Sequence, residues 1–178
     1  MNRCGDWDRG CVQVYTGDGK GKTTAAIGLA VRCAGAGYRV FIAQFVKGRH
    51  YCELDALKRL NDLIAVRQYG RTEFITEQPE PKDIELAQAG LAEAREEMLS
   101  GRYRLVILDE ANVATWFGLF SVEDLLAVID ARPPSVELLI TGRRADPRVI
   151  ERADLVTEMR CIKHYYECGL RARRGIED

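Results

Sequence analysis

The stretch that decides the fold is Val12-Gln-Val-Tyr-Thr-Gly-Asp-Gly-Lys-Gly-Lys-Thr-Thr24. Its first five residues predict a strand, and a helix of small residues is expected from residue 22 to about residue 36, ended by Gly35 and Gly37. The glycines between them allow several backbone N–H groups to converge on one anion, and the helix N-terminus adds its dipole. The stretch therefore predicts a binding site for the phosphates of a nucleoside triphosphate.

Within this loop, Lys22 is expected to supply a point charge and Thr23 a hydroxyl for a magnesium ion that bridges the phosphates. The usual pattern G-x-x-x-x-G-K-[ST] needs glycine at position 16, where this chain has Thr16. The loop from Gly17 to Gly21 is therefore one residue short, and we expect its nucleotide to be placed differently from that of an ordinary ATPase. We interpret the three glycines as serving the ligand and not the packing.

Short apolar runs alternate with helical patterns along the rest of the chain. Further strands are predicted at residues 39–45, 64–69, 105–108, 136–141 and 155–159. Helices are expected at residues 53–61, from residue 84 to Gly101, after a capping box of Ser121 and Asp124, and after Asp146-Pro147. This alternation predicts one parallel sheet covered on both faces, with its ligands at the carboxyl ends of the strands.

Two carboxylates, Asp109 and Glu110, follow the apolar strand predicted at residues 105–108. A magnesium ion near Thr23 would need an oxygen partner at this place. Acidic residues also end buried strands for structural reasons, but the phosphate loop favours a metal role here.

The sequence shows no clear residue to orient water for hydrolysis or to surround a moving phosphate. It also lacks the Asn-Lys-x-Asp signature, which disfavours GTP. A use of ATP that does not involve its γ-phosphate therefore stays open.

The composition bears on which partners the protein binds and on where in the cell it is located. The net charge of −1 gives no support for nucleic acid as a partner. No apolar run reaches the roughly 18–20 residues of a membrane span, and the start MNRCGDWDRG lacks the apolar block of a secretion signal, so a cytoplasmic location is expected. The six cysteines form no C-x-x-C pair, and we interpret them as free thiols rather than metal ligands or disulfides.

Several motifs together point to one family. They are Tyr15-Thr-Gly-Asp-Gly-Lys-Gly-Lys-Thr-Thr-Ala-Ala26, Gln44-Phe-Val-Lys-Gly48, Val106-Ile-Leu-Asp-Glu110, Asp130-Ala-Arg-Pro133, Ile140-Thr-Gly-Arg143 and Ala153-Asp-Leu-Val-Thr-Glu158. In these segments the chain resembles the P-loop ATP:corrinoid adenosyltransferases, also called cob(I)yrinic acid a,c-diamide adenosyltransferases. The likeness runs from about residue 12 to Gly175-Ile-Glu177, and the shortened loop is itself a family trait.

This resemblance implies an α/β fold of the P-loop NTPase-like (RecA-like) type, with three layers and a mostly parallel central sheet of about six strands. Residues 12–178 would form a single nucleotide-binding domain after a short segment, 1–11. The implied activity is transfer of the 5′-deoxyadenosyl group of ATP to the cobalt of a cob(I) corrinoid, with release of triphosphate, in adenosylcobalamin biosynthesis or salvage. Mg²⁺ or Mn²⁺, a homodimer and a reductase that supplies cob(I) are implied as well.

The resemblance also implies roles for individual residues. The nucleotide would be bound by Gly17, Asp18, Gly19, Lys20, Gly21, Lys22, Thr23, Thr24, Arg32 and Arg143. Lys22 and Glu110 would be catalytic, and the metal ligands would be Thr23, Glu110 and Asp109. Asp18 stands where relatives often have Asn, and Arg32 matches a family arginine on the first helix. Lys163-His164 also matches a family motif, with its role left open.

One segment departs from the family. Some relatives have a Gly-Phe-Thr-Trp segment that packs near the corrinoid, whereas this chain has Gly70-Arg71-Thr72-Glu73-Phe74-Ile75. The aromatic pair is replaced by Arg71 and Glu73, although Phe74 is close by. This departure keeps open a non-catalytic, ATP-gated corrinoid-binding module, and the phosphate loop with Asp109 and Glu110 would also suit a general P-loop ATPase or kinase.

Overall fold

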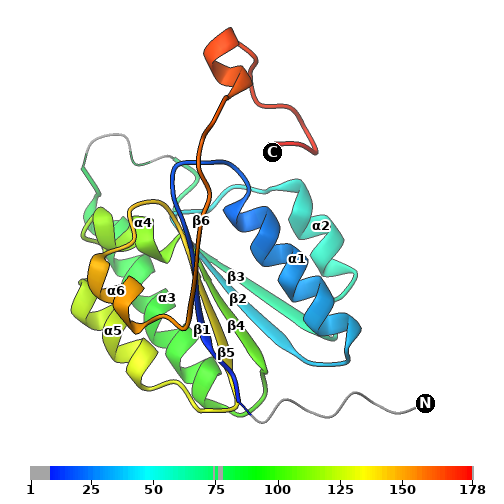
Figure 1. Ribbon diagram of the computed structural model, residues 1–178, viewed down its shortest axis with the longest axis vertical. Coiled ribbons are helices and arrows are strands. Elements are labelled where there is room, and N and C mark those ends of the chain that lie inside the picture. Colours follow the sequence, from blue (N-terminus) through cyan, green and yellow to red (C-terminus); the bar gives the residue numbers. More distant parts are fainter. Residues whose placement is uncertain (1–8, 74, 76–77, 178) are drawn as a thin grey trace.

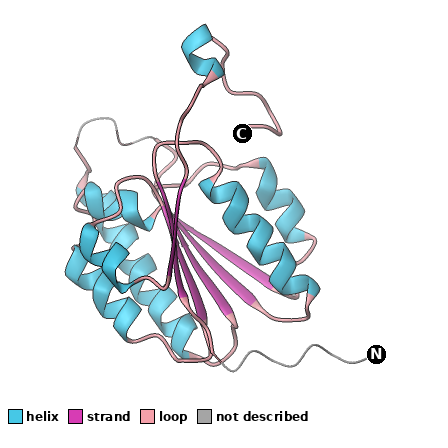
Figure 2. Ribbon diagram, viewed as in Figure 1, coloured by secondary structure: helices cyan, strands magenta, loops and turns pink. Residues whose placement is uncertain are grey.

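A computed structural model of the chain describes residues 9–73, 75 and 78–177. Within these residues a six-stranded sheet forms the middle of three layers (Figures 1 and 2). Its strands are β1 (Val12–Thr16), β2 (Val40–Phe45), β3 (Ile64–Tyr69), β4 (Leu105–Asp109), β5 (Glu137–Thr141) and β6 (Leu155–Glu158). They lie in the order β3-β2-β4-β5-β1-β6, and every neighbouring pair is parallel. The predicted fold class is confirmed, with a sheet that is wholly parallel.

Helices cover both faces of this sheet. One face carries α1 (Lys22–Gly35) and α2 (Cys52–Lys58). The opposite face carries α3 (Pro81–Leu99), α4 (Ala111–Trp116), α5 (Val122–Asp130) and α6 (Pro147–Arg152). Beyond β6, residues 159–177 form a C-terminal arm with a 3-10 turn, η1 (Tyr165–Cys168), which rises above the body in Figure 1.

Two hydrophobic cores separate the layers because successive side chains of a strand point to opposite faces. On β2, Phe41 and Phe45 belong to the core under α3, α4, α5 and α6, whereas Val40 and Ile42 belong to the core under α1 and α2. All five residues of β4 are buried, as predicted for a strand covered on both sides. The sheet is thereby fixed on both faces, and its carboxyl edge, where the strands end, is left to build a site.

The predicted elements agree closely with the observed ones. The strands at residues 12–16 and 64–69 have the predicted bounds, and the capping box of Ser121 and Asp124 is present. The helix expected at residues 53–61 ends earlier, at Lys58, because the chain continues from there into turns. The sequence analysis missed α4 and η1.

Three further expectations concern the chain as a whole. Its division into residues 1–11 and 12–178 stays a prediction. No helix among the described residues is long and apolar enough to cross a membrane. The five cysteines within that part of the chain carry free thiols, and burial raises the pKa of the Cys33 thiol to about 11. Cys4 lies outside the described residues.

Candidate active site

The loop between β1 and α1 is closed by its own lysine. Gly17 (φ 91°) and Gly21 (φ 114°) adopt the left-handed conformation that glycine accepts without strain. The Nζ atom of Lys22 donates hydrogen bonds to the carbonyl oxygens of Gly17 (2.6 Å) and Gly19 (2.7 Å). Burial lowers the pKa of Lys22, and the nearby carboxylate of Glu110 opposes that shift. The ammonium of Lys22 is therefore held by carbonyl groups of its own loop.

Gly17 and Gly19 also have a packing role, which corrects the expectation that these glycines serve only the ligand. A Cβ atom at Gly17 would lie 2.5 Å from the carbonyl oxygen of Met159, and one at Gly19 would lie 2.6 Å from it. The backbone N–H of Gly19 donates to the same oxygen at 2.6 Å. Glycine is thus required where the chain leaving β6 passes against the loop.

Asp109, at the end of β4, is 1% exposed and accepts hydrogen bonds from four side chains. Its Oδ1 accepts from the hydroxyls of Thr23 (3.0 Å) and Thr141 (2.7 Å). Its Oδ2 accepts from the ammonium of Lys47 (2.7 Å) and the amide of Gln44 (3.3 Å). Both oxygens are therefore engaged in positioning neighbouring side chains, and the predicted role of Asp109 as a metal ligand stays a prediction.

Lys47 is a site residue to which the sequence analysis assigned no role. Its Nζ lies 2.7 Å from Asp109 and 3.1 Å from the hydroxyl oxygen of Thr23, and 5.6 Å from the ring centre of Tyr51. Burial disfavours its charge, but Asp109 outweighs that effect and raises the pKa of Lys47. Its place just after β2, at the carboxyl edge of a parallel sheet, is the signal that could have identified it.

The carboxylate of Glu110, unlike that of Asp109, lines a cleft. The backbone of Glu110 is left-handed (φ 61°), and its N–H donates to the hydroxyl of Thr141 at 3.0 Å. Within the described part of the chain the carboxylate accepts no hydrogen bond. Burial, with Asp109 beside it, raises the pKa of Glu110. This carboxylate is free to meet a ligand.

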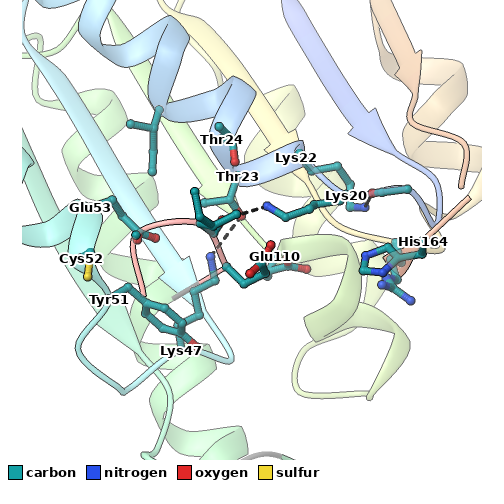
Figure 3. A pocket seen from close by; sticks show the side chains of 17 residues that line it. Lys20, Lys22, Thr23, Thr24, Lys47, Tyr51, Cys52, Glu53, Glu110 and His164 are labelled. Atoms are coloured by element: carbon teal, nitrogen blue, oxygen red, sulfur yellow. Dashed lines mark hydrogen bonds between the residues drawn. The ribbon is translucent and has the colours of Figure 1, made fainter. Parts of the chain in front are cut away.

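The cleft has a volume of about 620 Å³, within the usual range for small-molecule sites. Figure 3 shows Tyr51, Cys52 and Glu53 on one side of it and His164 on the other, with Lys22, Thr23, Lys47 and Glu110 between them. The remaining lining residues come from the loop and the start of α1, from the turn after β5, and from the end of the C-terminal arm: Gly19, Lys20, Gly21, Thr24, Ile27, Arg143, Gly175, Ile176 and Glu177. Most predicted site residues are thus brought together.

Five residues that the sequence assigned to the site or matched to a family motif lie outside the lining of this cleft, and one of them is the buried Asp109. Gly17 is partly buried in the loop, Asp18 next to it is exposed, and Lys163 is exposed beside His164. Arg32 is exposed on α1, ten residues after Lys22, which at about 1.5 Å per residue is about 15 Å along the helix. A nucleotide contact by Arg32 stays a prediction.

The C-terminal arm returns to cover the cleft. The Nζ of Lys20 donates to the carbonyl oxygen of Ile176 at 3.0 Å. The carboxylate of Glu177 accepts from Arg173 and from the hydroxyl of Tyr165, and these bonds lower the pKa of Glu177 to about 2. The end of the arm therefore contacts both an earlier part of the arm, through Glu177, and the phosphate loop, through Ile176.

Arg71, in the segment that follows β3, has a structural role. Its guanidinium forms a bidentate pair with Asp83 (2.8 and 3.1 Å) and a third contact with Glu80 (2.9 Å). Asp83 is 4% exposed and closes the capping box at the start of α3. Arg71 therefore fastens the segment after β3 to α3. Glu73 is exposed, and Phe74 lies outside the described residues.

An exposed aromatic surface lies elsewhere on the carboxyl edge. Trp116, at the end of α4, is 51% exposed, and the guanidinium of Arg144 lies 4.1 Å from its ring centre. Arg144 has a positive φ of 57°, and the preceding residue, Arg143, lines the cleft. Two consecutive arginines thus connect the cleft with the tryptophan.

A parallel sheet with helices on both faces, and a cleft at its carboxyl edge beside a glycine-rich strand-to-helix loop, define an α/β protein of the P-loop NTPase-like class. Within that class the chain belongs to the ATP:corrinoid adenosyltransferase family BtuR/CobO/CobP, whose profile matches residues 8–177. The resemblance recognised in the sequence is confirmed.

Relatives from several bacteria support this assignment. A corrinoid adenosyltransferase of Pseudomonas aeruginosa is 35% identical over 171 residues, which cover 96% of this chain and 84% of the relative. Corrinoid adenosyltransferase CobA of Salmonella typhimurium is 32% identical over 172 residues, covering 96% and 86%. A corrinoid adenosyltransferase of Escherichia coli is 32% identical over 171 residues, with the same coverage.

Proposed function

We propose that this protein transfers the 5′-deoxyadenosyl group of ATP to the cobalt of a cob(I) corrinoid and releases triphosphate, in adenosylcobalamin biosynthesis or salvage. The observation that carries the proposal is the cleft in which Lys22, Thr23 and Glu110 converge, in a chain of this family. A homodimer, a reductase that supplies cob(I) and a cytoplasmic location belong to the same proposal.

The proposed reaction does not require the protein to act as a general acid or base. Cobalt(I) attacks the ribose C5′ carbon, a cobalt–carbon bond forms, and the C5′–O bond breaks so that triphosphate leaves with the bonding electrons. No water needs activation, which agrees with the lack of a clear water-orienting residue in the sequence. The protein must hold the reacting atoms in line and stabilise the charge of the leaving triphosphate. Lys22 and Arg143 would supply that charge at the cleft.

The donor set of the cleft fits a magnesium or manganese ion. Thr23 offers a hydroxyl oxygen and Glu110 a carboxylate, and such ions are commonly bound by one or two protein oxygens together with phosphate oxygens and water. We assign Thr23 and Glu110 as the residues that would hold the ion. When bound, the ion would add positive charge beside the triphosphate.

For the corrinoid we propose a contact with Trp116. A corrinoid is a broad, flat ring, and an exposed indole held by Arg144 offers a flat apolar surface next to the cleft. Arg71 and Glu73 had favoured a binding module without catalysis. The ion pairs of Arg71 with α3 account for that residue structurally, so it no longer favours the module.

An anaerobic assay tests the proposal directly. Purified protein, ATP, a magnesium salt and chemically reduced cobinamide or cobalamin are mixed, and cob(I) absorbance is followed with the phosphate product. We expect loss of cob(I) with one triphosphate released per corrinoid. Orthophosphate release with cob(I) unchanged would indicate an ATPase, and tight corrinoid binding without turnover would indicate a binding module.

A further inference from the structure

The ammonium of Lys47 lies where a metal ion beside Thr23 would carry its charge. Its Nζ is 3.1 Å from the Thr23 hydroxyl oxygen and 2.7 Å from Asp109. The single hydrogen of the Thr23 hydroxyl is donated to Asp109, so this oxygen accepts from Lys47. A metal bound to the same oxygen would therefore be repelled by an ammonium only a few ångströms away.

The backbone that carries Lys47 is held in an unusual conformation. Val46 has a positive φ of 59°, which a β-branched residue rarely adopts. The turn is packed against the chain after β3, because a Cβ at Gly70 would lie 2.5 Å from the backbone nitrogen of Lys47, and one at Gly48 would lie 2.3 Å from the carbonyl oxygen of Gly70. Such strain persists where the surroundings fix it, and it concentrates at functional sites.

Lys47 can leave Asp109 without exposing an unpaired carboxylate. Asp109 keeps hydrogen bonds from Thr23, Thr141 and Gln44 when the lysine departs. Lys47 is also the more accessible partner, with 14% of its side chain exposed against 1% for Asp109, and it lines the cleft. The four-carbon stem of a lysine allows its charge to move by several ångströms while the backbone stays fixed.

We propose that Lys47 is a tethered cation with two positions. In one position its ammonium lies between Thr23 and Asp109. When nucleotide and metal enter, it moves to the triphosphate, which frees the Thr23 hydroxyl for the metal and adds a positive charge to the leaving group. The inference rests on the proposed function and extends it, since it adds a residue that contacts the triphosphate.

The first test measures binding of inorganic tripolyphosphate by calorimetry, without corrinoid. The variant is Lys47→Gln, whose amide retains a donor toward Asp109 but has no charge. We expect its affinity to fall about tenfold or more, because hydrogen bonds from charged donors are the strong ones. Lys82→Gln, on the exposed start of α3, is the matched control and should bind as the unaltered protein does. Equal affinity in Lys47→Gln and the unaltered protein overturns the proposal.

The second test measures binding of Mn²⁺ alone by electron paramagnetic resonance, without nucleotide. Removing the ammonium should tighten Mn²⁺ binding in Lys47→Gln by about tenfold, because the cation that competes for this place is gone. Unchanged Mn²⁺ affinity shows that Lys47 does not occupy the metal's place, and this also overturns the proposal.

A double variant covers the case in which Lys47→Gln does not fold. Lys47→Met with Asp109→Asn removes both charges of the pair, so that no unpaired carboxylate stays buried. It should show the same loss of tripolyphosphate affinity relative to Asp109→Asn alone, and no difference between them would reject the inference. Neither binding assay needs adenosyl transfer. Failure of the cob(I) assay with these results intact would therefore reject the proposed function and leave the two-position lysine standing.

Discussion

The floor and the roof of the cleft are built in different ways. The floor, which consists of Lys22, Thr23, Lys47 and Glu110, lies just after the central strands β2 and β4 and on the first turn of α1. The roof is the C-terminal arm, residues 159–177, which is mostly exposed and contacts the loop at two places: Met159 with Gly19, and Ile176 with Lys20. The floor is thus part of the folded core, whereas the roof is an addition to it. The floor therefore supplies charged groups that the sheet holds in place, and the roof supplies lining residues from an exposed segment.

The strongest way to break the floor is Lys22→Ala. We expect kcat/KM to fall by about a thousandfold or more, because a preorganised charge at the phosphates is lost. The circular dichroism spectrum should be unchanged, since the lysine bonds only to carbonyl groups of its own loop. Lys58→Ala, at the end of α2, serves as the control. An ATP affinity equal to that of the unaltered protein would contradict the assignment.

Glu110→Gln sharpens the comparison within the floor. It removes the open carboxylate and leaves Asp109 in its network, so the metal concentration for half-maximal activity should rise about 10- to 100-fold. The measurement is a magnesium titration at saturating ATP, with Glu85→Gln on α3 as the control. An unaltered magnesium profile would show that this carboxylate is not a ligand.

Trp116→Ala tests the surface beside the cleft. Loss of the indole should raise KM for the corrinoid about tenfold and leave KM for ATP unchanged, because aromatic stacking on a flat ring is removed. Val31→Ala, on an exposed position of α1, is a control of similar exposure. Equal changes in both Michaelis constants would point to a structural effect and not to a corrinoid contact.

Removing the last part of the roof, residues 171 onward, should have a small effect on the fold. A chain ending at Leu170 loses the contact of Lys20 with Ile176 and the bonds of Glu177. The unfolding temperature should stay within about 2 °C of the full-length value, since no buried core residue is removed. KM for ATP should rise a few-fold in steady-state assays. A large drop in unfolding temperature would mean that the arm supports the sheet.

The mildest change to the roof is a fall in pH. Arg173 and Tyr165 lower the pKa of Glu177 from 4.5 to about 2. A lowered pKa means that the bonds of Glu177 contribute fully above pH 4.5 and are lost as the pH falls toward 2. Pepsin should therefore cut the arm faster at pH 2 than at pH 4, relative to a matched peptide. In Glu177→Gln this additional pH dependence should disappear, and its persistence would contradict the assignment.

The strands, helices and turns that depend on nearby residues in the chain could be predicted from the sequence. The strands were recognised by apolar runs, and the loop by glycines next to Lys22 and Thr23. The helix α4 was missed because its six residues, ANVATW, are few and include poor helix formers. It is stabilised by tertiary packing, with Ala111, Asn112 and Ala114 all buried.

The missed parts of the site depend on contacts between distant segments. The packing role of Gly17 and Gly19 required Met159, about 140 residues later in the chain. The hydrogen bonds that both oxygens of Asp109 accept include bonds from side chains of β2, β5 and α1. No single sequence motif contains these side chains, so the bonds could not be predicted from one. Lys47 appeared in a recognised motif, but a lysine after a strand is ordinarily solvated, and only its neighbours show that its charge is paired.

The strand order determines when, during synthesis of the chain, the nucleotide loop can reach its folded structure. In the described sheet, the neighbours of β1 are β5 and β6. Val12 lies opposite Leu138 of β5, and Gln13 lies opposite Leu155 of β6, so these pairs can form only after both later strands have been made. On a ribosome, the nucleotide loop is made before β5 and β6, and its final surroundings form only after these later strands have emerged. Until the chain has emerged past β6, the N–H of Gly19 lacks the carbonyl oxygen of Met159 as its acceptor. A nascent chain is thereby kept from forming a finished nucleotide site before its sheet is closed.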